Sequence, residues 1–139
     1  MSRLALVTGA SGFIGGHVAA DLLGHALYWH ELDARGSTFA ARHAGDLLLA
    51  NDTWFAPSDV TVGPDGAIYV CDWHDARTAH PDPDAEWDRT NGRIYRIQPR
   101  GTAPRPTLDV TKLATSELIA RLAEANDWYV RRARRVLAD

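Results

Sequence analysis

The residues with the clearest capacity for chemistry lie in one polar stretch near the middle of the chain. Four acidic residues alternate along it: Asp82, Asp84, Glu86 and Asp88. Carboxylate oxygens are the ligands that Ca²⁺ prefers, although the central glycine and terminal glutamate of an EF-hand loop are absent from the stretch. We therefore treat Asp82, Asp84 and Glu86 as candidate calcium ligands. The alternative is a solvent-exposed connection in which the aspartates and prolines form turns.

The same stretch supplies a candidate general base. His80 with Asp72 or Asp88 could accept the proton of an alcohol, which a dehydrogenase requires before hydride leaves its substrate. These three residues are the candidate catalytic set. Zinc is not expected, because His74 and His80 have no cysteine and no third histidine near them in the sequence.

A glycine pattern near the N-terminus could bind a dinucleotide. The apolar run LALV is followed by TGASGFIG and an amphipathic run, which predicts a strand, a glycine turn and a helix. In such a turn Gly9 permits the tight bend and Gly12 lets backbone N–H groups approach a pyrophosphate. Gly15 then lets the helix pack closely against the strand, with the helix N-terminus facing the anion.

The sequence TGASGFIGGHVAADLL closely resembles the opening of NAD-dependent epimerases and dehydratases, the extended short-chain dehydrogenases. This resemblance implies NAD(P) as a cofactor and a truncated Rossmann-like opening over residues 1–25. Asp33 lies near the position where the family places the acid that holds the ribose hydroxyl, whereas Arg35 could favour a 2′-phosphate. The alternative for Asp33 is a turn residue before Gly36.

The catalytic pair of that family is missing from the chain. Short-chain dehydrogenases use a tyrosine and a lysine four residues later on one helix face. The residues four positions after the tyrosines of this chain are Leu32, Trp73, Pro99 and Ala133. Catalysis by the epimerase route is therefore not expected, while nucleotide binding remains an expectation.

The middle of the chain predicts an antiparallel meander. β-rich runs at residues 59–62 and 67–73 flank the turn GPDG, and a third run follows at residues 93–97. The second run is apolar on both sides, so we expect it to be buried on both faces with Cys71 inside. A meander of this kind is the unit of a propeller blade.

The segments GPDGAIYVCDW and DRTNGRIYRI resemble the last blade of the membrane-bound dehydrogenase family. Members of that family are β-propellers similar to sorbosone and glucose dehydrogenases, and HEAT-type helical repeats often follow the propeller. The resemblance implies propeller structure over residues 26–98. A complete propeller needs several blades of roughly 40–45 residues each, so this chain is expected to be catalytically incomplete alone.

The C-terminal part predicts a linker and two helices. PRGTAPRPT breaks the sheet and places a proline-rich linker at residues 99–112. Within residues 113–139, Ser116 is expected to cap the first helix and Asp127 the second. The expected apolar stripes are Leu118, Ile119 and Leu122, and then Val130, Ala133, Val136 and Leu137. The pair resembles the start of a HEAT array, with its arginines forming a solvated surface.

Composition limits the partners of the chain. Its 139 residues allow one modest domain, and a net charge of −3 leaves no broad basic field for nucleic acid. No apolar run approaches the roughly 18 residues of a membrane span. No export signal is visible, which favours a cytoplasmic location if the N-terminus is native. Cys71 is the single cysteine and excludes an internal disulfide.

The sequence thus predicts an α+β fold. It consists of a partial antiparallel β-propeller blade, preceded by a truncated Rossmann-like β-α opening and followed by an αα-hairpin.

Three functional hypotheses follow. The chain is a fragment or fusion that carries the terminal blade of a dehydrogenase-like propeller, or it is an NAD(P)-binding oxidoreductase or epimerase. The third hypothesis is a protein-interaction module that self-associates through exposed strand edges.

Overall fold

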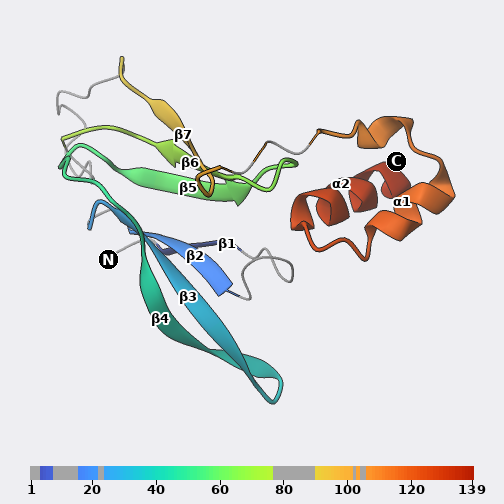
Figure 1. Ribbon diagram of the computed structural model, residues 1–139, viewed down its shortest axis with the longest axis horizontal. Coiled ribbons are helices and arrows are strands. Elements are labelled where there is room, and N and C mark those ends of the chain that lie inside the picture. The colour runs from blue at the N-terminus through green and yellow to red at the C-terminus, as the bar shows by residue number, and fades with distance from the viewer. Residues whose placement is uncertain (1–3, 8–15, 22–23, 77–89, 102, 104–105) are drawn as a thin grey trace.

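The structure, a computed structural model, describes residues 4–7, 16–21, 24–76, 90–101, 103 and 106–139. The strands of this part are β1 (Leu4–Val7), β2 (Gly16–Asp21), β3 (Ala26–Arg35), β4 (Thr38–Leu49), β5 (Pro57–Val62), β6 (Ile68–Asp72) and β7 (Arg93–Ile97). The helices are the 3₁₀ turn η1 (Val110–Lys112), α1 (Thr115–Arg121) and α2 (Asp127–Ala138). The strands form two sheets, and the helices lie together to one side of them (Figure 1).

Both sheets are antiparallel throughout. The first sheet has the strand order β1-β2-β3-β4, and the second has the order β5-β6-β7. The sheets pack together where β5 meets β1 and β2. The buried side chains of their shared core are Val18, Ala20, Leu27, Phe55, Val60 and Val70.

The predicted Rossmann-like opening is wrong. Residues 16–21, expected to be helical, form β2, which pairs antiparallel with β1 from Leu4 opposite Asp21 to Val7 opposite Val18. A dinucleotide-binding unit instead needs a helix that returns the chain to a parallel strand. The physical reason is the period of burial, because Val18 and Ala20 are both buried two residues apart on one face of the strand. In so short a run, that alternation and the pairing with β3 override the helical pattern.

The predicted propeller architecture is also wrong, although the three meander strands themselves are confirmed. Residues 26–49 belong to the segment 26–98 for which propeller structure was predicted. They form β3 and β4, which join β2 in a separate sheet, and this sheet covers the inner face of the meander. A blade would instead present this face to a neighbouring blade. The described residues therefore form a mostly β domain of two packed sheets.

The described residues cover only one face of the second sheet. Val70 is fully buried, whereas its neighbour Cys71 is exposed, and so are Trp73 at 48% and Ile94 at 73%. Cys71 lies between Asp59 and Ile94 in one row across the three strands. The predictions that this strand is buried on both sides and that Cys71 is a core residue are both wrong, because no second layer lies over the outer face in the described part of the chain.

The HEAT-type hairpin is replaced by a small self-contained cluster. Helix α1 has seven residues and α2 has twelve. They pack with η1 around Val110, Leu118 and Ala133. Leu118, Val130 and Ala133 are buried as predicted, but Ile119 is 56% exposed and Leu137 is 37% exposed. Because the cluster closes on the 3₁₀ turn, the pair does not present the continuous apolar face that a repeat array requires.

The observed N-cap residues lie one or two residues before the predicted ones, Ser116 and Asp127. Ala114 is the N-cap of α1, and its backbone N–H donates to the Glu117 carboxylate at 2.8 Å. The cap of α2 is Asn126, whose Oδ1 accepts from the backbone N–H of Trp128 at 3.0 Å. Asn126 also donates from Nδ2 to the carbonyl oxygen of Gly63 at 2.9 Å. One side chain thus caps α2 and ties it to the turn between β5 and β6.

This turn is built around Asp65. Its Oδ2 accepts from the Tyr69 hydroxyl at 3.0 Å and from Arg96 Nε and Nη2 at 2.9 and 2.7 Å, while Oδ1 accepts from the backbone N–H of Ala67 at 3.1 Å. Gly66 has a φ of +80°, a conformation that side chains disfavour. A Cβ on Gly63 would lie 2.4 Å from the Tyr69 ring. The Asp65 carboxylate therefore links the β5–β6 turn to β7.

The Asp65 network predicts a pH dependence of stability. Burial alone would raise the pKa of Asp65, but hydrogen bonds from Arg96, Ala67 and Tyr69 together hold this pKa below its usual value. The carboxylate therefore stabilises the folded state above about pH 4, the unfolded pKa, and this stabilisation is lost as the pH falls through the lower folded-state pKa. We expect the difference in unfolding free energy between the wild type and Asp65→Asn to be largest near neutral pH and to shrink in acid. Urea titrations at several pH values measure it, and a difference that grows in acid would contradict the assignment.

Candidate functional site

Most of the residues predicted to act as ligands or catalysts lie outside the described part of the chain. This holds for Gly9, Gly12 and Gly15, and for His80, Asp82, Asp84, Glu86 and Asp88. The calcium prediction and the general-base role of His80 therefore stay predictions. Asp33 is described and is exposed on β3, directly opposite Ala40. The NAD(P) prediction stays untested, but the strand–helix unit on which it depended is replaced by two antiparallel strands.

Asp72, the third catalytic candidate, is buried at the end of β6. Its Oδ1 accepts from the backbone N–H groups of Ala56 at 2.8 Å and His74 at 2.9 Å. Among the described residues its Oδ2 has no hydrogen-bond partner, although His74 Nδ1 lies 3.4 Å away. Arg93 donates to that same Nδ1 at 2.9 Å, so the nitrogen acts as an acceptor there and does not donate to Asp72.

The surroundings of Asp72 indicate a structural role. His74 is 6% exposed and has a φ of +50°, which is uncommon for a residue other than glycine. Asp72 holds this conformation by accepting from the His74 backbone, and it fixes the start of β5 through Ala56. Asp72 Oδ2 is the oxygen that a substrate could contact. However, Asp72 and His74 are both almost inaccessible to solvent, so a substrate cannot easily reach it. The cluster therefore positions the chain as it leaves β6.

A more accessible feature is the two-stranded ribbon that β3 and β4 form beyond the rest of their sheet. The pairing of β2 with β3 ends where Gly16 lies opposite Glu31. Beyond that point, residues 32–41 pair with one another across a turn at Gly36, whose φ is +62°, and no other described strand pairs with them. We call residues 32–41 the β3–β4 arm. Figure 1 shows this arm projecting away from both sheets and from the helices.

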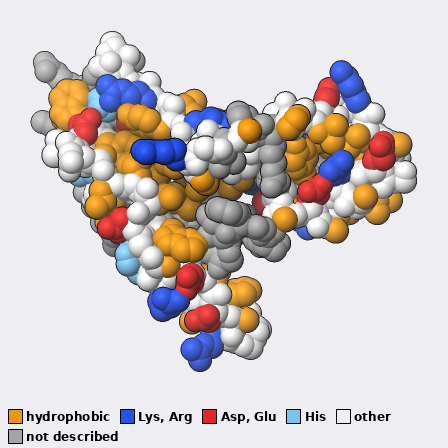
Figure 2. Space-filling model, viewed as in Figure 1, with side chains coloured by type: hydrophobic (Ala, Val, Ile, Leu, Met, Phe, Trp, Pro, Cys, Tyr) orange, Lys and Arg blue, Asp and Glu red, His pale blue; other side chains and the backbone are white. Residues whose placement is uncertain are grey.

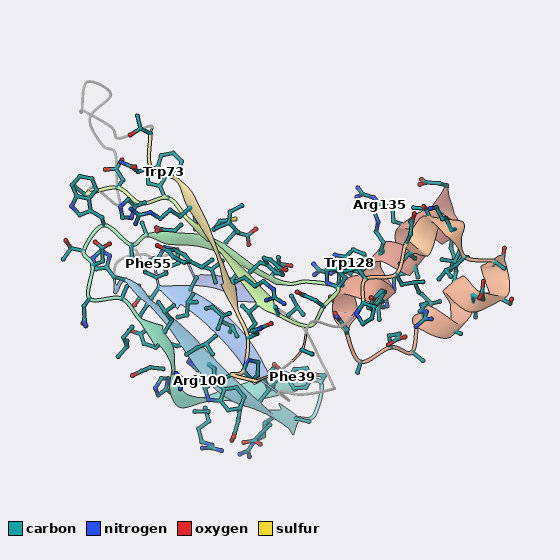
Figure 3. All side chains as sticks on the ribbon, turned by 45° about the horizontal axis from the view of Figure 1, so that its top comes forward. Phe39, Phe55, Trp73, Arg100, Trp128 and Arg135 are labelled. Atoms are coloured by element: carbon teal, nitrogen blue, oxygen red, sulfur yellow. The ribbon has the colours of Figure 1, made fainter. Side chains whose placement is uncertain are left out.

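The side chains of the arm have almost no cover. Every residue from Asp33 to His43 is exposed. Phe39, near the tip of β4, is 65% exposed (Figure 3). Arg42 and Glu31 form an ion pair at its base. Hydrophobic and charged side chains lie side by side on the arm in Figure 2.

The outer edge of β4 is a second property of this arm. No other strand of the described chain pairs along that edge. β-Bulges interrupt the pairing with β3 only nearer the sheet, where Ala44 and Leu47 have no opposite residue. From Thr38 to Arg42 the register is regular, and the segment Thr38-Phe39-Ala40-Ala41 carries no charge and no proline. Natural edge strands usually carry charged residues, prolines or bulges, which prevent edge-to-edge pairing. Because this stretch has none of the three, it can pair with the strand of a partner.

A cluster of imidazole rings lies at the base of the arm. His30 and His43 face each other across β3 and β4 with ring centroids 5.5 Å apart, and Tyr28 packs edge-on against His43 at 5.7 Å. His43 Nε2 lies 3.5 Å from Asp46 Oδ1. None of these residues was a sequence-based candidate. The even spacing of His17, His30 and His43 along the sequence was a signal, but its meaning depends on the strand register.

These observations define the class of protein as a two-sheet antiparallel β domain with a projecting arm and a small helical cluster. The chain belongs to the family described as a domain of unknown function, DUF7133, which matches residues 15–101. The match covers β2 to β7 and leaves out the helices. No curated protein and no solved structure matches the chain. None of the helices in the described ranges is both long enough and apolar enough to cross a membrane.

Proposed function

We propose that the chain is a self-association module whose β3–β4 arm pairs, edge to edge, with the same arm of a second copy. The observation that carries this proposal is the absence of cover on the arm, since residues 33–43 are exposed and β4 has an unpaired outer edge within the described chain. Antiparallel pairing of the two β4 strands would join the two four-stranded sheets into one continuous sheet. Such an interface has twofold symmetry, the commonest arrangement in homo-oligomers.

The energetics favour a partner for the arm. A two-stranded hairpin alone is marginally stable in water at best, because each strand has one neighbour and its side chains remain hydrated. A third and a fourth strand would pair with the N–H and C=O groups along the β4 edge that no described strand contacts. Complete burial of a phenylalanine contributes roughly 1.5–3 kcal/mol. Edge pairing would cover part of each Phe39 ring, so we expect a fraction of this gain from each of the two copies.

The charges of the arm are compatible with this pairing. Arg42 and Glu31 already form an ion pair within one chain, so pairing at the edge would not leave either charge without a partner. The uncharged segment from Thr38 to Ala41 is the part that would meet its copy. Closer to the sheet, the two bulges bend β4 and would limit the length of the new ladder. We therefore expect a short, reversible interface.

Sedimentation velocity at increasing protein concentration tests the proposal. The wild-type chain should form a dimer at roughly 100 μM, where an interface of micromolar affinity is largely occupied. Phe39→Glu should shift the chain to a monomer, because it removes the apolar cover and places two negative charges at the interface. The matched control is Ile94→Glu on β7, which changes a residue of similar exposure, 73%, on the other sheet.

Two results would contradict the proposal. One is a wild-type chain that remains monomeric over the whole concentration range. The other is a dimer that Ile94→Glu dissociates and Phe39→Glu does not, since this would place the interface on the outer face of the second sheet. Circular dichroism of both variants confirms that the fold is retained, which we expect because both residues are exposed.

A further inference from the structure

The β3–β4 arm has one apolar face and one charged face. Residues directly opposite each other in antiparallel strands share a face of the sheet, and neighbours along a strand alternate between the faces. Phe39 opposite Ala34 and Ala41 opposite Leu32 therefore lie on one face. The other face carries the charged side chains of the arm and its base, which are Glu31, Asp33, Arg35 and Arg42. A symmetry axis perpendicular to the sheet keeps the apolar faces of two paired copies on the same side.

The turn of the arm determines which backbone groups of β4 point to its outer edge. Gly36, the first central residue, has a φ of +62°, and Ser37, the second, does not have a positive φ. This is the pattern of a two-residue type II′ hairpin, in which the residues that flank the turn form a hydrogen-bonded pair. Hydrogen-bonded and non-hydrogen-bonded pairs then alternate along the strands. Phe39 and Ala41 therefore direct their N–H and C=O groups away from β3.

Twofold symmetry restricts the registers in which two β4 edges can pair. Opposite residues share a face, and the axis leaves every residue on the same face in both copies. One residue must therefore lie opposite its own copy at the axis, and each alternative register moves this residue by one position. The candidates are residues 38–42, where the pairing of β4 with β3 is regular.

Ala40 at the axis satisfies the backbone and suits the side chains. Phe39 then lies opposite the partner's Ala41, and Ala41 opposite the partner's Phe39, so the outward N–H and C=O groups of both residues have partners. The small side chain of Ala41 leaves room for the ring of Phe39, which is 65% exposed in one chain. Arg42 lies opposite the uncharged Thr38 of the partner. The two Phe39 rings become diagonal neighbours, which aromatic side chains are long enough to bridge.

The other registers each conflict with a feature of the arm. An axis nearer the turn than Ala40 would set part of the uncharged segment against the turn residues 36–37. An axis at Arg42 would place two like charges directly opposite each other, which is destabilising. An axis at Ala41 would carry the ladder into the bulge that follows His43, where the strand bends.

We infer that two arms pair in one register, with Ala40 of each copy opposite Ala40 of the other and each Phe39 ring lying over the partner's Ala41. This inference rests on the proposed self-association and specifies which residues select the partner. Ala40 lets the strands approach at the axis, where a non-hydrogen-bonded pair has its Cα atoms about 4.5 Å apart. Ala41 accommodates the ring. The two small side chains are thus the specificity-determining residues of the interface.

Disulfide cross-linking of the full chain tests the register. The native Cys71 is first replaced by serine, which its exposed position tolerates. In that background Ala40→Cys places two thiols opposite each other with Cα atoms about 4.5 Å apart, within the range that a disulfide spans. Ala41→Cys is the matched control, because its two thiols would be diagonal neighbours with Cα atoms about 7–8 Å apart, too far for a bridge. With oxidised glutathione and about 100 μM protein, we expect at least about fivefold more covalent dimer from Ala40→Cys than from Ala41→Cys.

Phe39→Glu in the Ala40→Cys chain should lower cross-linking to the level of the Ala41→Cys control, because it prevents pairing. More covalent dimer from Ala41→Cys than from Ala40→Cys would overturn the register and leave self-association standing. Cross-linking that Phe39→Glu does not change would overturn it too, since random collision would explain the product. So would the absence of covalent dimer from either cysteine in a chain that sediments as a dimer. A wild-type chain that sediments as a monomer would contradict both the self-association and the register.

Discussion

Asp72→Ala is expected to lower the free energy of unfolding by about 3 kcal/mol, because it leaves two buried backbone N–H groups without their acceptor. These are the N–H groups of Ala56 and His74, which donate to Oδ1 at 2.8 and 2.9 Å. Asp72 is 3% exposed, so water cannot easily replace the lost oxygen. Urea-induced unfolding followed by tryptophan fluorescence measures the change.

Asp72→Asn separates the hydrogen bonds of this residue from its charge. Asparagine keeps an oxygen for the two N–H groups and replaces Oδ2, which has no hydrogen-bond partner among the described residues, with an NH₂ group. We expect it to be within about 1 kcal/mol of the wild type. The exposed Asp33→Ala is the control and should change stability by less than about 0.5 kcal/mol. If Asp72→Asn were as destabilising as Asp72→Ala, the negative charge near His74 and Arg93 would be the essential feature.

Leu27→Ala should cost about 3 kcal/mol of unfolding free energy, since it removes a fully buried side chain from the core that the two sheets share. Leu27 belongs to the first sheet and packs in one cluster with Val60 and Val70 of the second. The substitution would leave a cavity between the two sheets. This cavity would weaken the contact between the sheets as well as the packing of β3. Thermal and urea-induced unfolding both report this loss.

Leu49→Ala is the matched control for this substitution. Leu49 ends β4 and is 61% exposed, so the same chemical change should alter stability by less than about 0.5 kcal/mol. Similar losses in the two variants would show that the two sheets do not share a core around Leu27. A loss confined to Leu27→Ala would support the packing of the sheets as described.

The β5–β6 turn is a feature that the local sequence predicts correctly. Glycine supplies the positive φ at Gly66, and the short side chain of Asp65 accepts from the Ala67 backbone two residues later. Both features depend on residues within the turn, so the sequence predicted the hairpin. It also predicted β7, because residues 93–97 alternate and follow an Asn-Gly turn signal. The hydrogen bonds from Arg96 to Asp65 were not predicted, because they join β7 to a turn that lies about 30 residues earlier in the chain.

Residues 16–21 show where local sequence failed. GHVAAD is compatible with a helix or a strand, and a run of six residues is too short for its period to decide. Pairing with β3 and burial of Val18 and Ala20 settled the choice. The exposure of Cys71 was hidden for a related reason. Side chains alternate along a strand, so Cys71 and Val70 point to opposite faces of the sheet. The sequence does not show which of these two faces the other sheet covers.

The sequence alone therefore determined the turns, the meander strands and the approximate positions of the two helices, since backbone preferences and capping act over a few neighbouring residues. Tertiary structure decided that the strands divide into two packed sheets, that β3 and β4 project as an arm, and that His30 and His43 lie opposite each other. The register of β3 with β4 includes two bulges, and each bulge reverses which side chains share a face. Such pairings depend on contacts between residues distant in the chain, and no local pattern encodes them.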